Sequence, residues 1–305
     1  VGGSPVMNHT ALAIREGGPR RVSPFAMTSF LANLAAGWIS IRYGFRGPLG
    51  TPVTACAASA QAIGDGMRLI MTGEAEVAVV GGAEGSIDPI SVGGFGAARA
   101  LSTAFNDVPE AASRPFDRAR DGFVLAEGAA VLVIERLSHA LARGAKPLAI
   151  LAGYGTSADA YHLTAGEPTG AGAQVAMRNA LRMAKLSPGE IDYINAHSTS
   201  TGVGDAAELA GIGAVFENRG KDLAISSTKS ATGHLMGAAG AIESVFSIMA
   251  LRDGVVPPTR NLEDPDVGDR FDLVPKVAKL KTLRHVLSNS FGFGGVNASL
   301  VFSAI

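Results

Sequence analysis

The sequence predicts an α/β fold in which strands alternate with helices and parallel sheets are covered on both faces. Three observations predict it. Hydrophobic residues make up 47% of the 305 residues and charged residues only 17%. Glycines number 39 and aromatic residues are few, which suits closely packed layers. Short β-branched runs alternate with Ala-rich segments of helical period along the chain, the pattern of βαβ units. A chain of this length can bury about three quarters of its unfolded surface.

A first run of elements lies in the N-terminal half. The segment 76–81 reads Glu-Val-Ala-Val-Val-Gly, a β-branched run typical of a buried strand, and the helix before it ends near Gly73. The expected elements are a helix over 31–43, an extended segment over 52–55, a helix over 57–72, the strand at 76–81, and a pair of strands at 129–134 and 149–153.

A second, similar run follows. Its expected elements are helices over 172–184, 205–216 and 237–252, and strands over 191–196, 223–227, 286–290 and 296–302, the last two joined by a Gly-rich turn. The repetition indicates an internal duplication with its join near residues 155–170. We therefore predict two halves, 1–155 with the cysteine and 156–305 with the pair His197 and His234.

Charge and composition exclude several classes of protein. The net charge is −1 and Lys/Arg residues do not cluster with aromatics, so no nucleic-acid footprint is expected. No apolar run reaches 18 residues and no signal peptide opens the chain, which predicts a cytoplasmic protein that does not insert in a membrane. The chain has no initiator Met, and residues 1–24 hold turn residues without an opening strand, so we expect residues upstream.

Cys56 is the one cysteine, and it stands between a small apolar segment and the helix expected over 57–72. Unpaired N–H groups and the positive end of a helix dipole favour the nucleophilic thiolate at such a position. A lone cysteine is more often a small buried apolar residue. Taken alone, Cys56 leaves both interpretations open.

His197 and His234 also follow expected strands. His197 comes after the apolar strand that begins at Ile191, and His234 follows the strand at 223–227. In open α/β sheets, ligands meet the chemistry outside the carboxyl ends of the strands. Each histidine alone can be an ordinary loop residue, but three reactive groups at three strand ends predict one shared site.

Metal and nucleotide sites do not fit the spacing. Structural zinc ligands normally come in pairs at short spacing, and neither C-x-x-C nor H-x-x-x-H occurs. Lys229 is not preceded by G-x-x-x-x-G-K, and the Gly-rich segment 291–295 does not match G-x-G-x-x-G. That segment instead predicts a tight turn whose N–H groups can approach a reacting oxygen. We expect no metal and no cofactor.

Six segments, in order along the chain, closely resemble the β-ketoacyl-acyl-carrier-protein synthases, the type II elongating condensing enzymes of fatty acid synthesis. They are 54–60, 93–102, 114–123, 195–201, 226–240 and 289–297. The resemblance covers nearly the whole chain and implies the thiolase fold, with duplicated βαβαβαββ halves in an α-β-α-β-α arrangement. It also implies an incomplete first half, because roughly a hundred further residues begin that half in the family.

The resemblance implies roles for the reactive residues. Cys56 would take the acyl chain as a thioester from carrier-protein phosphopantetheine, and His197 and His234 would bind the thioester oxygen of the malonyl carrier protein during decarboxylation. The N–H groups of Cys56 and Phe291 would form the oxyanion hole. Lys229 would hold His234 and the local field in place.

Further positions match residues around the substrate in the family. Thr199 and Thr201 match residues that line the pantetheine arm, and Phe291 matches the aromatic gate over the cysteine. Phe95 and Val1 would line the acyl pocket. The turn at 290–295, with Phe291 and Phe293, is expected to be a mobile gate, with a rigid tight turn as the alternative.

Two features qualify the match. Four residues correspond to positions that surround a buried monovalent cation in relatives, with an ordinary hydrogen-bond network as the alternative; they are Asn195, Glu243, Ser288 and Asn289. Ser198 stands where the family usually has glycine, and its Cβ would restrict the backbone if φ were positive.

The sequence therefore predicts a 3-oxoacyl-[acyl-carrier-protein] synthase, an acyltransferase that joins an acyl-Cys56 thioester and malonyl carrier protein by decarboxylative Claisen condensation in fatty acid elongation. Expected partners are an acyl carrier protein and a second copy of the chain in a homodimer. Two alternatives remain open. One is a polyketide or modified-lipid synthase of the same superfamily, and the other is a catalytically silent carrier-protein-binding subunit, against which the presence of Cys56, His197 and His234 speaks.

Overall fold

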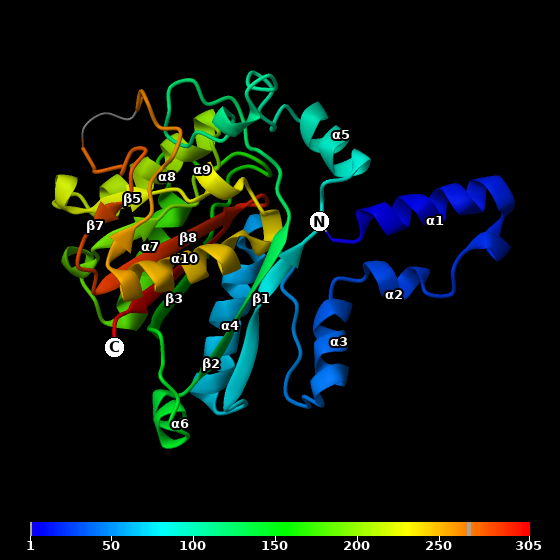
Figure 1. Ribbon diagram of the computed structural model, residues 1–305, viewed down its shortest axis with the longest axis horizontal. Helices are drawn as coiled ribbons and strands as arrows, with labels where there is room; N and C mark the ends of the chain where they lie inside the picture. Colours follow the sequence, from blue (N-terminus) through cyan, green and yellow to red (C-terminus); the bar gives the residue numbers. More distant parts are fainter. Residues whose placement is uncertain (1, 267–269) are drawn as a thin grey trace.

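The two main β-sheets lie face to face with two helices between them (Figure 1), and β6 (Val255–Val256) and β7 (Lys279–Leu280) form a separate two-stranded sheet. The computed structural model describes residues 2–266 and 270–305, so Val1, expected in the acyl pocket, lies outside the described residues. The larger sheet has the order β3-β9-β8-β4-β5 and the smaller one pairs β1 with β2. The strands are β1 Val77–Glu84, β2 Gly128–Glu135, β3 Ile150–Ala158, β4 Tyr193–Asn195, β5 Ala224–Ser226, β8 His285–Gly292 and β9 Val296–Ser303.

Four long helices complete the layers. Helices α7 (Ala171–Ala184) and α8 (Gly202–Val215) cover one face of the larger sheet. Helices α4 (Ala58–Thr72) and α10 (Ala239–Asp253) lie between the two sheets. Small residues permit this close packing, because a Cβ added at Gly240 would lie only 2.8 Å from the Cβ of Ala60.

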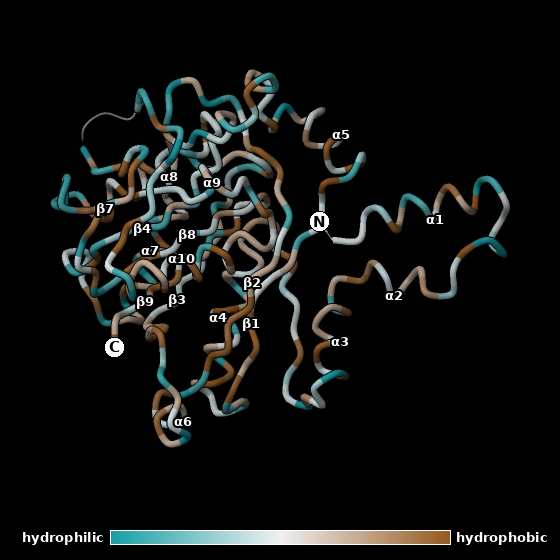
Figure 2. Tube along the Cα trace, in the orientation of Figure 1, coloured by the Kyte–Doolittle hydropathy of each residue, from teal (hydrophilic) through white to brown (hydrophobic). Residues whose placement is uncertain are grey.

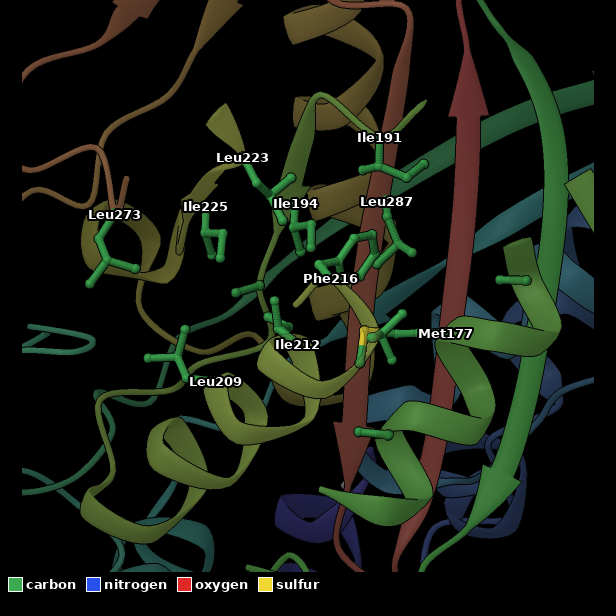
Figure 3. Close-up of a cluster of buried hydrophobic side chains, with 14 of the residues drawn as sticks. Met177, Ile191, Ile194, Leu209, Ile212, Phe216, Leu223, Ile225, Leu273 and Leu287 are labelled. Atoms are coloured by element: carbon green, nitrogen blue, oxygen red, sulfur yellow. The ribbon is translucent and has the colours of Figure 1, made fainter. Parts of the chain in front are cut away.

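The apolar core follows the same layers. Figure 3 shows Met177 of α7 and Ile212 of α8 in one cluster with Leu287 of β8, and all three side chains are fully buried. Burial of each such side chain stabilises the fold by roughly 1.5–3 kcal/mol relative to exposure. A second cluster fills the space between the sheets around α4 and α10, and the trace is brown, or hydrophobic, along much of β1 beside α4 (Figure 2).

Most expected elements are confirmed within a few residues. The helix expected at 31–43 is α3, Leu34–Tyr43, and the strands expected in both halves are all present except the extended segment at 52–55. That segment contains no strand, and a 3-10 turn begins at Ala55. The 14-residue helix α1, Ser4–Gly17, was missed in a region expected to hold turns.

The predicted sheet pairing needs two corrections. The larger sheet is mixed, since β4 runs parallel to β5 and β8 while β9 runs antiparallel to β8 and β3. The expected pairing of 129–134 with 149–153 is wrong, because β2 pairs with β1 and β3 pairs with β9. The predicted boundary after residue 155 falls inside β3, Ile150–Ala158, and the division into two halves stays a proposal.

The first half leaves apolar surface uncovered. Alternate residues of β1 and β2 point away from the core, and Val77, Val79, Val131 and Val133 are 40–62% exposed. Helices α1 and α2 (Ala26–Phe30) extend away from the body, with α3 beside them (Figure 1). None of the helices in the described ranges combines the length and hydropathy needed to cross a membrane.

The remaining elements are short. They are α5 Pro89–Ala97, α6 Leu137–Ala142, α9 Lys229–Thr232, β6 Val255–Val256 and β7 Lys279–Leu280.

Candidate active site

Cys56 lies in a 3-10 turn, Ala55–Ala57, that leads directly into α4. The helix begins one residue later than expected. Ala55 has a φ of 50°, a left-handed conformation that an alanine adopts only at a cost, and this turn aims the following cysteine at the second half of the chain. Cys56 is 5% exposed. The nucleophile candidate is therefore held by a strained turn at the head of a buried helix.

Both histidines reach this cysteine. His234 Nε2 lies 3.0 Å from Cys56 Sγ, across 178 residues of sequence. The rings of His197 and His234 stand edge to face with centroids 5.5 Å apart. The sulfur and one ring nitrogen of each histidine all lie within 4.8 Å of one another. The structure thus brings the three predicted residues together.

Lys229 contacts His197 rather than His234. Its Nζ lies 3.4 Å from His197 Nδ1, and it forms an ion pair with Glu243 in which both side chains are at most 2% exposed. An ammonium has only donors, so the facing Nδ1 must offer its lone pair. This assigns the proton of His197 to Nε2, the nitrogen directed at the site. The expectation that Lys229 holds His234 itself is corrected, because its hydrogen bond goes to the other ring.

The pKa of Cys56 does not match the expectation of a thiolate. Burial raises the pKa of the Cys56 thiol to about 11, although Lys229 and two backbone N–H groups oppose the shift. The favourable helix end is therefore outweighed, and the resting group is a thiol. Burial, assisted by the charge of Lys229, also lowers the pKa of both His197 and His234 well below the usual value, so both rings are neutral.

The backbone N–H beside the sulfur comes from a different phenylalanine than the one predicted to serve the oxyanion hole. The backbone N–H of Phe293, not that of Phe291, donates to Cys56 Sγ, together with the N–H of Cys56 itself. Phe291 lies within β8, paired with Asn297, and its ring centroid is 5.9 Å from that of His197. Sequence alone could not distinguish the two phenylalanines, since both stand beside glycines.

The turn after β8 packs tightly on the cysteine turn. A Cβ at Gly292 would lie 2.8 Å from Thr54 O and 3.1 Å from Cys56 N. Gly294 and Gly295 have φ of 87° and 72°, and the N–H of Gly294 donates to Leu163 O at 2.7 Å. Motion of this turn stays a prediction.

An apolar cluster adjoins the sulfur. Cys56, Phe123 and Met236 are its buried members, and Phe95 packs against them. Phe95 and Phe123 meet edge to face at 5.3 Å, and Phe123 lies edge to face on His234 at 5.4 Å. Phe95 thus lies near Cys56, and its place in an acyl pocket stays a prediction. Phe123 and Met236 were missed as lining residues, because an apolar side chain carries no local signal of what it lines.

The two predicted threonines lie at the start of α8. Thr199 Oγ1 and Thr201 Oγ1 are 3.2 Å apart, and both residues are partly exposed. Thr201 N donates to the buried Asp205, which also pairs with Arg120. The loop that carries both hydroxyls is therefore anchored by the buried Asp205.

Sequence reasoning missed the group that fixes the His197 loop. The carboxylate of Glu208, in α8, accepts hydrogen bonds from the N–H groups of His197 and Ser198 and from the Ser198 hydroxyl. Ser198 does not adopt a positive φ, whereas Ser200 does, with φ 74°. The Cβ that stands where the family usually has glycine is therefore accommodated without strain.

A metal fits the trio of ligand atoms poorly. Metal-bound histidines normally donate their other ring N–H to an acceptor. Here the ammonium of Lys229 faces Nδ1 of His197, and Nδ1 of His234 has no hydrogen-bond partner among the described residues. Two neutral donors directed at a common point match an oxyanion better than a cation.

The four residues matched to a monovalent cation site are all buried. Asn195 pairs with Ser288 across β4 and β8, and its Oδ1 accepts from Thr228 at 3.4 Å. Asn289 Oδ1 accepts from Ser299 at 2.8 Å. Glu243 Oε2 has no partner within the described part of the chain. The hydrogen-bond network thus accounts for both amides, and a cation at Glu243 stays a prediction.

Comparisons with known proteins agree with this arrangement. The family model described as "Beta-ketoacyl synthase, N-terminal domain" matches residues 2–140, and "Beta-ketoacyl synthase, C-terminal domain" matches residues 148–263. The chain is 51% identical to 3-oxoacyl-[acyl-carrier-protein] synthase 2 of Rhizobium meliloti, over 99% of this chain and 71% of that protein. It is 52% identical to 3-oxoacyl-[acyl-carrier-protein] synthase, mitochondrial, of Arabidopsis thaliana, over 94% of this chain and 63% of that protein.

Comparison with solved structures of similar chains identifies the fold. A type II polyketide ketosynthase, in complex with its acyl-carrier protein and bound to a hexaketide, superposes with a TM-score of 0.96 at 34% identity, covering 99% of this chain and 76% of that one. A β-ketoacyl synthase from Burkholderia phymatum STM815 gives 0.93 at 35% identity, covering 100% and 73%. The predicted thiolase fold is confirmed, and the chain belongs to the β-ketoacyl synthase family.

Proposed function

We propose that this chain is a 3-oxoacyl-[acyl-carrier-protein] synthase that elongates acyl chains by decarboxylative condensation. The observation that carries the proposal is the convergence of one thiol and two neutral imidazoles beside an apolar cluster. The curated relatives quoted above carry this name at about half identity, which supports the same assignment.

The first half-reaction moves the acyl group to Cys56. Its sulfur attacks the carbonyl carbon of the acyl thioester, the carbon–sulfur bond to phosphopantetheine breaks, and the cysteine proton leaves with the released pantetheine thiol. The N–H groups of Cys56 and Phe293 hold the oxygen that becomes negative in the tetrahedral intermediate. A thiol of high pKa makes a poor resting nucleophile, so the thiol must lose its proton as the sulfur attacks, and that proton ends on the released pantetheine thiol.

The second half-reaction forms the carbon–carbon bond. The bond between the malonyl α-carbon and its carboxylate breaks, CO₂ leaves, and the electron pair becomes an enolate. Nε2–H groups of His197 and His234 donate to the enolate oxygen, a role that requires neutral rings. The α-carbon attacks the acyl-Cys56 carbonyl, and the sulfur leaves and takes up one proton. The overall condensation consumes one proton, and water supplies it to the departing sulfur.

Substrate binding is assigned to polar and apolar side chains near Cys56. The hydroxyls of Thr199 and Thr201 would bind the pantetheine arm, and Phe95 would line the acyl pocket with Phe123. Phe293, 39% exposed on the turn above Cys56, would close the mouth.

A homodimer and a cytoplasmic location are also proposed. The uncovered valine face of β1 and β2 supports assembly, since a contiguous apolar face is rarely left in water. None of the helices in the described ranges could cross a membrane, which is consistent with the proposed location.

One experiment tests the function. Purified protein mixed with an acyl carrier-protein thioester should gain the mass of the acyl group, and addition of malonyl carrier protein should then yield the 3-oxoacyl product and CO₂. Cys56→Ala should abolish the mass gain yet still decarboxylate malonyl carrier protein, while His234→Ala should lose decarboxylation far more than acylation. A parent protein that takes up no acyl group would support a silent carrier-binding subunit, and repeated extension without reduction would support a polyketide synthase.

A further inference from the structure

We propose that the hydroxyl of Ser198 positions His197 for catalysis by completing the hydrogen-bond shell of the buried Glu208 carboxylate. The inference rests on the proposed function of His197 as a donor to the enolate oxygen. It concerns the position at which this chain departs from the family pattern.

Four donors converge on Glu208. Its Oε1 accepts from the N–H of His197 at 2.9 Å and from Asn289 Nδ2 at 3.1 Å. Its Oε2 accepts from the N–H of Ser198 at 2.6 Å and from Ser198 Oγ at 2.7 Å. A carboxylate offers about four acceptor sites, so the shell is full. With glycine at 198, one of the four sites would stay empty.

Burial of Glu208 and Ser198 makes the fourth hydrogen bond important for the charge state of the carboxylate. Glu208 is 3% and Ser198 1% exposed, so water cannot replace the serine hydroxyl. Burial raises the pKa of Glu208, and the hydrogen bond from Ser198 is the largest effect that lowers it. Lys229, from α9, also lowers this pKa. Glu208 in turn raises the pKa of Asp205 on its own helix and of Glu243 on α10.

The carboxylate in turn fixes the loop. The backbone N–H groups of His197 and Ser198 both donate to the Glu208 carboxylate, and Ser227 Oγ donates to Ser198 O at 2.7 Å. A protonated Glu208 would give up one acceptor oxygen to its own proton. The loop would then lose an anchor, and the Nε2–H of His197 would shift away from the point it shares with His234.

The test compares two variants with a matched control. Ser198→Ala removes only the hydroxyl, and Ser198→Gly also removes the Cβ. Ser244→Ala is the control, because its fully buried hydroxyl donates to Gly240 O at 2.6 Å within α10 and does not reach Glu208. Condensation is measured against pH for parent and variants.

We expect the acidic limb of the kcat profile to move to higher pH in both Ser198 variants. A hydrogen bond to a charged group is worth about a tenfold to hundredfold change in an equilibrium, so kcat at about pH 6 should fall about tenfold, with recovery to within about twofold near pH 8.5. KM should change little, and Ser244→Ala should follow the parent.

A second readout does not need activity. Hydrogen exchange of the amides in the segment 195–201 should accelerate at acidic pH in Ser198→Ala and not in Ser244→Ala. A loss limited to Ser198→Gly would assign the effect to the Cβ, and an equal loss at every pH would assign it to packing; either result overturns the proposal. If the parent does not condense, the proposed function fails, and the exchange measurement still decides the role of Ser198.

Discussion

Gly292→Ala tests the contact between the turn after β8 and the cysteine turn. The added Cβ would lie 2.8 Å from Thr54 O, 3.1 Å from Cys56 N and 3.3 Å from Ala57 N. Ordinary contact begins at 3.4 Å, so the two turns must separate by about 0.6 Å. Backbone atoms form both sides of this contact, and no flexible side chain can move aside instead.

The expected magnitude follows from which atoms move. The methyl group would stand against the N–H of Cys56, and the neighbouring Phe293 carries the second oxyanion donor. Complete loss of one such donor typically costs about 10²–10³-fold in rate. A partial displacement should therefore slow acylation of Cys56 about 10- to 100-fold, and overpacking should lower the free energy of unfolding by roughly 1–3 kcal/mol.

The assay is the rate of acyl mass gain on the intact protein, together with urea unfolding. Gly37→Ala is the control, since it lies inside α3 and its added Cβ would meet no atom nearer than 3.9 Å. It should acylate at the parent rate. If Gly292→Ala also acylates at the parent rate, Gly292 does not set the distance between the two turns, and the assignment of the oxyanion donors loses its support.

Three further outcomes are expected. Lys229→Met should lower the free energy of unfolding by roughly 3–5 kcal/mol in urea titrations, because it leaves the Glu243 carboxylate buried and unpaired, and adding Glu243→Gln should restore most of it. The rate of Cys56 alkylation by iodoacetamide should rise about tenfold per pH unit up to the thiol pKa of about 11, since only the thiolate reacts. If the rate stops rising below about pH 8, the helix end stabilises the thiolate more than burial destabilises it. Crystals of free and Cys56-acylated protein should differ at Phe291 and Phe293, and the same positions in both would refute a moving gate.

Several parts of this protein follow from the sequence by itself. The Ala-rich segment after Cys56 and the β-branched run 76–81 specify a helix and a strand through local preference, and both are present. Reactive residues placed just after strands indicate a shared site, because the ends of neighbouring strands meet at one edge of a sheet. His197 and His234 were predicted in this way, whereas Cys56 was expected to follow an extended segment that forms no strand. The helix α1 was missed because its Gly, Ser and Pro residues suggested turns.

The tertiary structure alone decided how those residues act. The 3.0 Å contact between Cys56 and His234 joins residues 178 apart, and no local pattern sets such a distance. Burial outweighs the helix end in fixing the thiol pKa, and burial is a property of the whole fold. The pairing of β3 with β9, the N–H of Phe293 at the sulfur and the clamp by Glu208 all depend on long-range contacts. Local sequence determines the elements and their reactive residues, while distances, protonation and hydrogen-bond partners arise only when distant segments pack and exclude water.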